Sequence, residues 1–494
     1  MSTAPPEDRV TRRLLALFAL LKDPLSRRGL AQLTECDPAD VERRLTRLTE
    51  QGVIVRVDAG HWQAAEMPPT PPFAQRGDAD AEDPLLSCLL NDSGLADLRR
   101  AARITDIMRR HLRDDRCAAV LLCLDVLFAL ALRAPWDALS GEDCRRYLHL
   151  VRQVQSVSMM FAYRMPRAMT LLPPARRAAQ RIGDERSLLM LDLMEGCQQH
   201  LSHLHNLESP RALLSDVMRR IQALGDSDIL TSTSTGVGLV HFMQGEYEQA
   251  IASFKQCPAG FFLDHFDYLE EVRLRYIGSA ACALGRPDLG VGPMLSSLFE
   301  ARERGYRQTV KWHKVHLSDQ LLRVGLLEQG LALLTEVAHC CDPESETKLW
   351  FWSCRNLAYY HFQCGRIEVA HSIMTNGMTL CIQYGMPRPY YGFTWIFDML
   401  GAFRRRGLPD IPGYGYEQEI RSGMQSPNPL YRSAALRAHV LTSLEKGLPP
   451  ENPVALLRRS LALAEQAHSP LDAARCRLAL SVCLRREGRR EEAD

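Results

Sequence analysis

Two groups of histidines have the spacing at which imidazole rings on one side of a helix could share a metal ion. His200, His203 and His205 form the first group, and His313 and His316 form the second. A metal site needs further ligands that converge on the ion, usually cysteine, aspartate or glutamate. Neither group has an obvious ligand of that kind nearby in the sequence. We therefore interpret these side chains as exposed helix histidines and expect no metal site.

The sequence also lacks the short motifs that hold phosphates or activate a nucleophile. It contains no GxxxxGK[ST] loop, no GxSxG, no HExxH and no HRD motif. The run TSTSTGV at residues 231–237 is rich in small polar residues but has no lysine, and it reads as the start of a helix. We expect a protein that is not an enzyme and that has no cofactor, ATP included.

Composition narrows the class of protein further. The formal net charge is +1, so contact with nucleic acid or a membrane surface would need a local basic patch. The N-terminus has no apolar signal region, and the most apolar stretch, residues 117–132, is short and contains Asp125. The 15 cysteines form no CxxC pair, which favours reduced thiols. We expect a soluble cytoplasmic protein without a membrane partner.

Glycines recur at nearly constant intervals in the C-terminal half, and successive gaps are 40, 40, 40, 42, 40 and 41 residues. Similar phrases follow several of them, among them GEYEQA, GLLEQG, GRIEVA and GRREEA. A glycine between two helical segments supplies the left-handed residue that ends the first helix. The glycines of this series are Gly245, Gly285, Gly325, Gly365, Gly407, Gly447 and Gly488.

Small residues accompany these glycines where two helices would have to touch. The positions seven before are Gly238, Gly278, Ser318, Ala358 and Ser481, and those five after are Ala250, Gly290, Gly330, Ala370 and Ala493. Large apolar residues follow nine after, at Phe254, Met294, Leu334 and Met374. The pattern resembles tetratricopeptide (TPR) repeats, although the period is near 40 rather than that family's 34.

The resemblance covers residues 231–494, preceded by divergent helical repeats over 85–230. The units at Gly407 and Gly447 fit poorly, and the Pro/Gly/Tyr-rich run 407–429 looks like a break or insertion. The phrase GRREEAD stops inside the second helix of its hairpin, so we expect the native chain to continue past Asp494, with a possible further domain.

The TPR resemblance implies a groove lined by the first helix of each hairpin. Groove positions lie thirteen, ten, six and three residues before each hairpin glycine. The candidate residues for holding a peptide or small effector are Arg275, Trp312, Asp319, Trp352, Arg355 and Tyr359. Aromatic and arginine side chains are enriched at binding hot spots. The alternative is that the aromatics seal contacts between neighbouring hairpins.

Residues 9–66 predict the order helix, helix, turn, helix and strand hairpin. Asp37 is a candidate N-cap with Pro38 at the first helical position, and Val41, Leu45 and Leu48 share one face of the third helix. The phrase LAQLTECDPADVERRLTRLTEQGVIVRV resembles the core of a winged helix-turn-helix domain. That resemblance implies duplex-DNA contacts from Arg27, Arg28, Arg43, Thr46, Arg47, Arg56 and His61.

Acidic side chains on or beside the third helix would repel the phosphates of DNA, so an alternative to DNA binding stays open. Asp37, Asp40, Glu42 and Glu50 lie on or beside it. Winged helices also serve as connectors in signal-transducing NTPase regulators of the STAND type, and residues after the linker at 67–84 are similar to the first helices of their sensor arms. The chain would then lack the NTPase itself.

These expectations combine into a mostly α protein, a TPR-like α-α superhelix preceded by a small winged helix-turn-helix domain. The sequence favours a bacterial-type regulatory protein, most concretely a transcriptional regulator or its sensor arm. The alternative is a scaffold for protein–protein interaction in which the winged helix is a connector that does not bind DNA.

Overall fold

A computed structural model gives the structure of the chain. It describes residues 25–26, 37–50, 54–58, 61–64, 98–113, 115–160, 165–202, 208–225, 227–256, 270–343, 345–383, 394–447, 450 and 452–493. The chain divides into two compact units, residues 1–111 with 118–154 and residues 112–117 with 155–494. The fold is mostly α, as predicted.

The first unit contains a short three-stranded sheet and four described helices. The sheet has the antiparallel order β1-β3-β2, and Trp62 of β3 lies opposite both Leu25 and Arg56. The elements are β1 (Leu25–Ser26), α3 (Pro38–Glu50), β2 (Ile54–Asp58), β3 (His61–Ala64), α5 (Leu98–Arg113), α6 (Cys117–Arg133) and α7 (Gly141–Met160). The two helices that the sequence predicts before α3 lie outside the described residues.

Helix α3 begins and packs as the local sequence dictates. The Asp37 carboxylate accepts a hydrogen bond of 2.7 Å from the amide of Ala39, which satisfies a backbone donor at the helix start. Val41, Leu45 and Leu48 recur at helical spacing and are buried. This apolar face fixes which side of α3 remains exposed.

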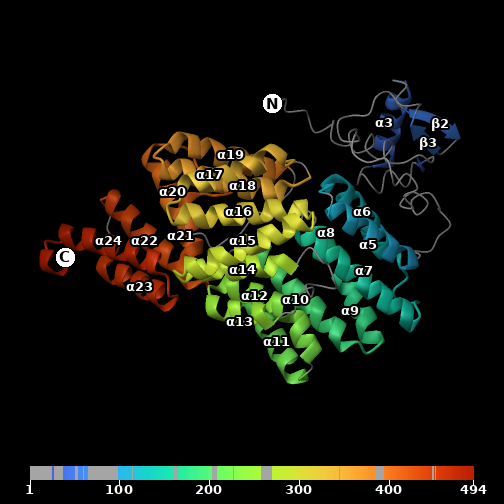
Figure 1. Ribbon diagram of the computed structural model, residues 1–494, viewed down its shortest axis with the longest axis horizontal. Coiled ribbons are helices and arrows are strands. Elements are labelled where there is room, and N and C mark those ends of the chain that lie inside the picture. Colours follow the sequence, from blue (N-terminus) through green and yellow to red (C-terminus); the bar gives the residue numbers. More distant parts are fainter. Residues whose placement is uncertain are drawn as a thin grey trace. The chain divides into compact units, whose positions relative to one another are not determined.

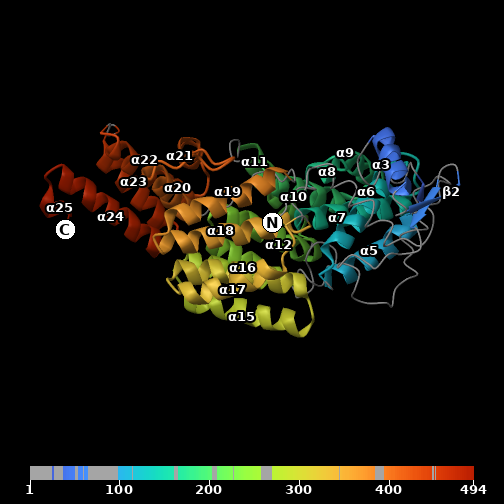
Figure 2. The same ribbon diagram turned by 90° about the horizontal axis from the view of Figure 1, so that it is seen from above.

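The second unit is a succession of helices, and consecutive helix pairs lie side by side in Figures 1 and 2. Before the periodic region stand α8 (Met165–Met169), α9 (Leu172–Arg181), α10 (Glu185–Ser202) and α11 (Glu208–Leu224). The pairs that follow are α12 (Ser227–Gln244) with α13 (Tyr247–Gln256), α14 (Glu270–Ala283) with α15 (Pro287–Glu303), α16 (Arg307–Arg323) with α17 (Leu327–Cys340), α18 (Thr347–Gln363) with α19 (Ile367–Gln383), α20 (Trp395–Arg405) with α21 (Tyr416–Met424), α22 (Pro429–Glu445) with α23 (Pro453–Gln466), and α24 (Pro470–Arg486) with α25 (Arg490–Ala493).

Every glycine of the predicted series ends the first helix of a pair. All seven have positive φ, between +69° at Gly407 and +86° at Gly325, a conformation that other residues adopt only with strain. Gly407 and Gly447 do so as well, and α20–α21 and α22–α23 are helix pairs. The helical pairing therefore continues through 407–429, and the residues between Arg405 and Tyr416 form a longer connection than in the other pairs. The departure is confined to a short second helix, preceded by a bridge between Ile411 and Tyr414.

Small residues allow the two helices of a pair to approach closely. A Cβ atom on Gly278 would lie 2.3 Å from Met294 and 2.6 Å from the carbonyl oxygen of Gly290. On Gly238 it would lie 2.8 Å from the Phe254 ring. Ala358 and Ala370 are fully buried in the α18–α19 pair. The four large residues nine positions after the glycines are buried too, so each fills the space that the small residues leave.

The array also contacts itself across a long stretch of sequence. The side-chain amide of Asn428 donates a 3.0 Å hydrogen bond to the carbonyl of Met243, while its oxygen accepts from the first amides of α22. A Cβ atom on Gly285 would lie 2.2 Å from Pro470. One apolar cluster joins Tyr247 and Leu284 to Leu430 and Ala473. The turns of the first two pairs therefore pack against α22–α24.

The helices of the described residues include none with the length and apolar character needed to span a membrane.

The packing of α18 on α19 makes a testable prediction. Ala358→Leu and Ala370→Leu each add side-chain volume at a fully buried position and should cost about 1–3 kcal/mol of unfolding free energy. Chemical denaturation followed by circular dichroism measures this loss. Ala332→Leu, at an exposed position of α17, is the control and should change stability little. If both buried substitutions leave the midpoint unchanged, the assigned hairpin contacts are wrong.

Candidate functional site

The first helices α14, α16 and α18 are neighbours, and they bring most of the predicted groove residues together. Arg275 lies on α14, Trp312 and Asp319 lie on α16, and Trp352, Arg355 and Tyr359 lie on α18. Side chains ten residues before each hairpin glycine recur on the same face because each unit repeats the same helix pair. Residues at equivalent positions of successive repeats therefore lie close together in space.

Within this cluster the contacts form a continuous chain. The Arg275 guanidinium lies 5.5 Å from the centre of the Trp312 ring. The Trp312 and Trp352 rings meet edge to face, 5.9 Å between centres. Arg355 lies 4.4 Å over Trp352 and 3.4 Å from the Asp319 carboxylate. Each of these contacts is a cation–π, aromatic or charge-assisted interaction, so each is electrostatically favourable.

All six predicted residues are buried, so much of their contact area seals neighbouring helix pairs. Tyr359, for example, stacks on Trp395 of α20 at 4.2 Å between ring centres. Two neighbours that the sequence did not single out, Tyr276 and Lys348, are only half-buried. Lys348 lies 5.8 Å from the Trp312 ring, so the cluster has a solvent-accessible edge.

The histidines of α16 contradict their sequence interpretation. His313 and His316 are buried rather than exposed. His313 Nε2 lies 2.7 Å from the Ser297 hydroxyl, and the His316 ring lies 4.6 Å from that of Trp352. Burial, followed by the charge of Arg275, holds the pKa of both well below the ordinary value, so they are neutral near pH 7. The expectation of exposed histidines failed because neighbouring helices cover α16 on several sides.

A second polar group lies where the array contacts itself. Arg323 of α16 and Arg475 of α24 come from positions more than 150 residues apart. Arg475 lies 3.5 Å from Asp472. Burial alone would lower the pKa of Arg323, but Asp319 and Asp472 raise it. Sequence spacing could not find this group, because its members come from helices that are far apart in the sequence.

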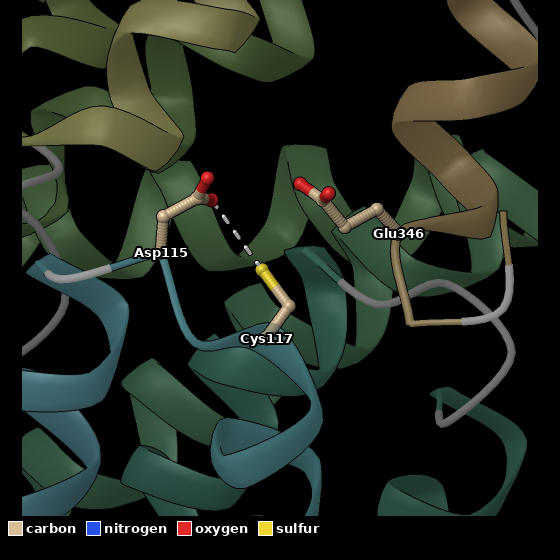
Figure 3. A group of neighbouring side chains, drawn as sticks. All are labelled: Asp115, Cys117 and Glu346. Atoms are coloured by element: carbon tan, nitrogen blue, oxygen red, sulfur yellow. Dashed lines mark hydrogen bonds between the residues drawn. The ribbon is translucent and has the colours of Figure 1, made fainter. Parts of the chain in front are cut away.

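A third cluster joins the turn before α6 to α16 and α18 within the second unit. Asp115, Cys117 and Glu346 bring an oxygen or sulfur atom each within 4.8 Å of one another (Figure 3). The Lys311 ammonium lies 2.7 Å from the Asp115 carboxylate and 2.6 Å from that of Glu346. Lys311 therefore supplies a positive charge to both carboxylates.

The electrostatics of this cluster follow from burial and mutual pairing. Burial raises the pKa of Asp115 and of Glu346, and Lys311 opposes the rise in both. Burial alone would lower the pKa of Lys311, but Glu346 and Asp115 raise it above the ordinary value. Burial and the two carboxylates keep the pKa of the Cys117 thiol well above its usual range, so it is not a reactive thiolate.

Three of the predicted DNA-contacting residues lie on α3, and Arg43, Thr46 and Arg47 are all exposed. Arg43 forms an ion pair of 3.3 Å with Asp40, and the Thr46 hydroxyl donates to the carbonyl of Glu42. Arg56 and His61 lie in β2 and β3. Arg27 and Arg28 lie outside the described residues.

Comparisons with known proteins give the fold. No protein-family model matches the sequence, and no curated protein matches it. A crystal structure of a Rap protein complexed with competence and sporulation factor matches with a TM-score of 0.51 and 14% identity, over 72% of this chain and 95% of that one. A STAND protein with a tetratricopeptide repeat sensor from Pyrococcus horikoshii gives a TM-score of only 0.33 at 13% identity, over 99% of this chain and 66% of that one. The first likeness shows the fold alone and confirms the predicted TPR-like repeats.

The cluster around Lys311 makes a prediction with a control on the same helix. Lys311→Met leaves Asp115 and Glu346 buried without their cation and should cost about 3–5 kcal/mol of unfolding free energy. Lys314→Met removes a lysine paired with the exposed Glu336 and should cost about 1 kcal/mol or less. Urea denaturation compares the two variants. Equal losses would contradict the assigned role of Lys311.

Proposed function

We propose that this chain is a regulatory protein whose repeat unit holds a protein or peptide segment against α14, α16 and α18. The observation that carries the proposal is the chain of contacts from Arg275 through Trp312 and Trp352 to Arg355, with Tyr276 and Lys348 at its accessible edge. Large aromatic and arginine side chains supply most of the binding energy at protein interfaces. We propose no catalytic role.

The comparison supports the same class of partner. The Rap protein of similar fold is complexed with competence and sporulation factor, and the likeness covers nearly all of that chain. Helical repeats expose extended surfaces that are suited to binding a chain segment. A segment bound along the first helices of this array would contact residues from several repeats at once, which gives selectivity from a repeating scaffold.

Binding of peptides can be measured with a defined probe. The full chain is dialysed against a pool of random octapeptides, and the retained peptides are counted by mass spectrometry. Wild type should retain a subset, and Trp352→Leu should reduce retention at least tenfold because its ring joins the two halves of the cluster.

Trp350→Leu is the matched control, since Trp350 is half-buried two residues away on the same helix. It should retain the peptides nearly as wild type does, provided that circular dichroism shows both variants folded. Equal retention by the two variants would place the peptide elsewhere.

For the N-terminal unit we propose the finer role of contact with duplex DNA. The exposed face of α3 carries Arg43 and Arg47, and the neighbouring strands β2 and β3 form the hairpin that a winged helix requires. One feature favours the rival role of a connector. Asp40 forms ion pairs with both Arg43 and Arg44, and these arginines lower its pKa, so part of the basic charge is already neutralised.

Salt dependence distinguishes these two roles. If α3 contacts DNA, the double variant Arg43→Ala with Arg47→Ala should weaken binding of the full chain to duplex DNA of mixed sequence. The slope of the logarithm of the binding constant against the logarithm of the salt concentration should become shallower by about one for each lost phosphate contact. Folding should be unaffected because both side chains are exposed, opposite Val41, Leu45 and Leu48. Arg145→Ala, exposed on α7, is the control. No binding by wild type at low salt would leave the scaffold role.

A further inference from the structure

The first helix of the last described pair, α24, exposes apolar side chains along one side. Leu471, Leu478 and Val482 are 40%, 68% and 40% exposed, and Ala474 is exposed between them. Residues at intervals of three and four lie in one line along a helix, so these four residues form a stripe, here called the α24 stripe. Single exposed apolar side chains are common, whereas a contiguous series of them indicates an interaction surface.

The same side of the preceding first helices is buried. Leu478 lies ten residues before its hairpin glycine, Gly488. The residues ten before the hairpin glycines from Gly285 to Gly447 are at most 7% exposed, and they are Arg275, Val315, Arg355, Phe397 and Arg437. On α24, therefore, a position that the other repeats bury presents a leucine to solvent.

Contacts within the array show what covers this position, which is the first helix of the following pair. Arg275 of α14 lies 5.5 Å from the ring centre of Trp312 on α16. Arg355 of α18 lies 5.5 Å from the centre of an indole ring of α20. Phe397 of α20 meets Tyr431 of α22 at 4.8 Å between ring centres. In each case the cover is a helix that places an aromatic side chain on the residue ten before the glycine.

The end of the array that carries the stripe has an excess of positive charge. Residues 453–493 contain eight arginines against five acidic residues, a net charge of +3. Ion pairs inside this segment, such as Arg477 with Glu465, leave the sum unchanged because both partners are counted. Arg477 and Arg486 are exposed and flank the stripe on opposite sides. A second copy would bring the same positive charge against itself, whereas an acidic helix would be attracted.

We propose that the α24 stripe binds an amphipathic helix of a partner protein, with an aromatic residue on its apolar side and acidic residues along its margins. This helix would lie beside α24 as α16 lies beside α14. Its aromatic side chain would contact Leu478, and its carboxylates would face Arg477 and Arg486. The apolar anchors supply affinity, and the charges supply orientation and selectivity. The inference goes beyond the proposed function, since it uses none of the residues of α14, α16 and α18.

Peptides of defined sequence test the surface. Each is fluorescently labelled, blocked at its other end, and has 17 residues, the length of α24. Leucines and one central tryptophan stand three and four residues apart, and the positions along both margins are all Glu, all Gln or all Lys. Fluorescence anisotropy with the full chain should show the Glu peptide binding at least tenfold more tightly than the Lys peptide, with the Gln peptide between them. A Glu peptide of shuffled order, which has no apolar stripe, should bind at least tenfold more weakly.

Variants of α24 locate the contact. Leu478→Glu should weaken binding of the Glu peptide at least tenfold, because it places a charge in the middle of the stripe. Leu478→Ala, a milder change, should weaken it at least threefold. Circular dichroism should show both variants folded, since the side chain is exposed in the free protein. Phe299→Glu is the matched control, because Phe299 is 60% exposed on α15 and its replacement should leave binding unchanged.

A second pair of substitutions tests the charges. Arg477→Gln with Arg486→Gln should reduce the preference for the Glu peptide over the Lys peptide at least threefold, while the Gln peptide binds as before. Equal binding of the Glu and Lys peptides by wild type would contradict the acidic partner.

Four further outcomes overturn the inference and leave the proposed function untouched. Failure of every peptide to bind the folded chain is one. Binding that survives in folded Leu478→Glu would place the contact elsewhere. A wild-type dimer that Leu478→Glu makes monomeric in sedimentation would show that a second copy covers the stripe. If residues after Asp494 in a longer native chain abolish peptide binding, the array covers this side itself.

Discussion

The close approach of paired helices at small residues is the constraint on which the rest of the second unit depends. At Gly278 and Gly290 the backbones come so near that a single added Cβ atom would overlap a carbonyl oxygen. Interiors packed to this density do not absorb extra volume without moving whole helices. The distance between the helices of a pair sets the spacing of α14, α16 and α18, and hence the distances among Arg275, Trp312 and Trp352.

Two lysines of the repeat unit show how neighbouring side chains decide the effect of burial. Lys311 lies between two carboxylates, and its pKa is raised. Lys348 lies near Arg275 and an indole ring, and its pKa falls to about 8. The first lysine joins the turn before α6 to the start of α18 through its two carboxylates, and the second lies beside an aromatic ring and another cation.

Contacts between distant parts of the array tie the turns of its first hairpins to α22 and α24. Asn428 both caps α22 and donates to the carbonyl of Met243, so a single side chain links the start of one helix to the end of α12. Gly285 meets Pro470 at a distance that leaves no room for a side chain. The same arrangement brings Arg323 and Asp472 into electrostatic contact. These contacts place the charges of Arg323 and Asp472 near each other, in addition to the charged side chains of the aromatic cluster.

The sequence by itself determined the features that depend on local geometry. Positive φ at each of the seven hairpin glycines, the small residues seven before and five after them, and the capping of α3 by Asp37 all follow from residue type and spacing. The six candidate groove residues were also found this way, because equal repeats place equal positions on one face. Their binding role stays a prediction.

Only the tertiary structure decided which side chains from distant segments meet. His313 and His316 appeared to be surface residues in a list of spacings, but α16 is enclosed by α14, α15 and α18. The meeting of Asp115, Lys311 and Glu346, the position of Lys348 over Trp312, and the contact of Asn428 with Met243 depend on how many small helix rotations add up along the array. A local pattern fixes each hairpin, whereas the sum of their rotations is a property of the whole packed chain.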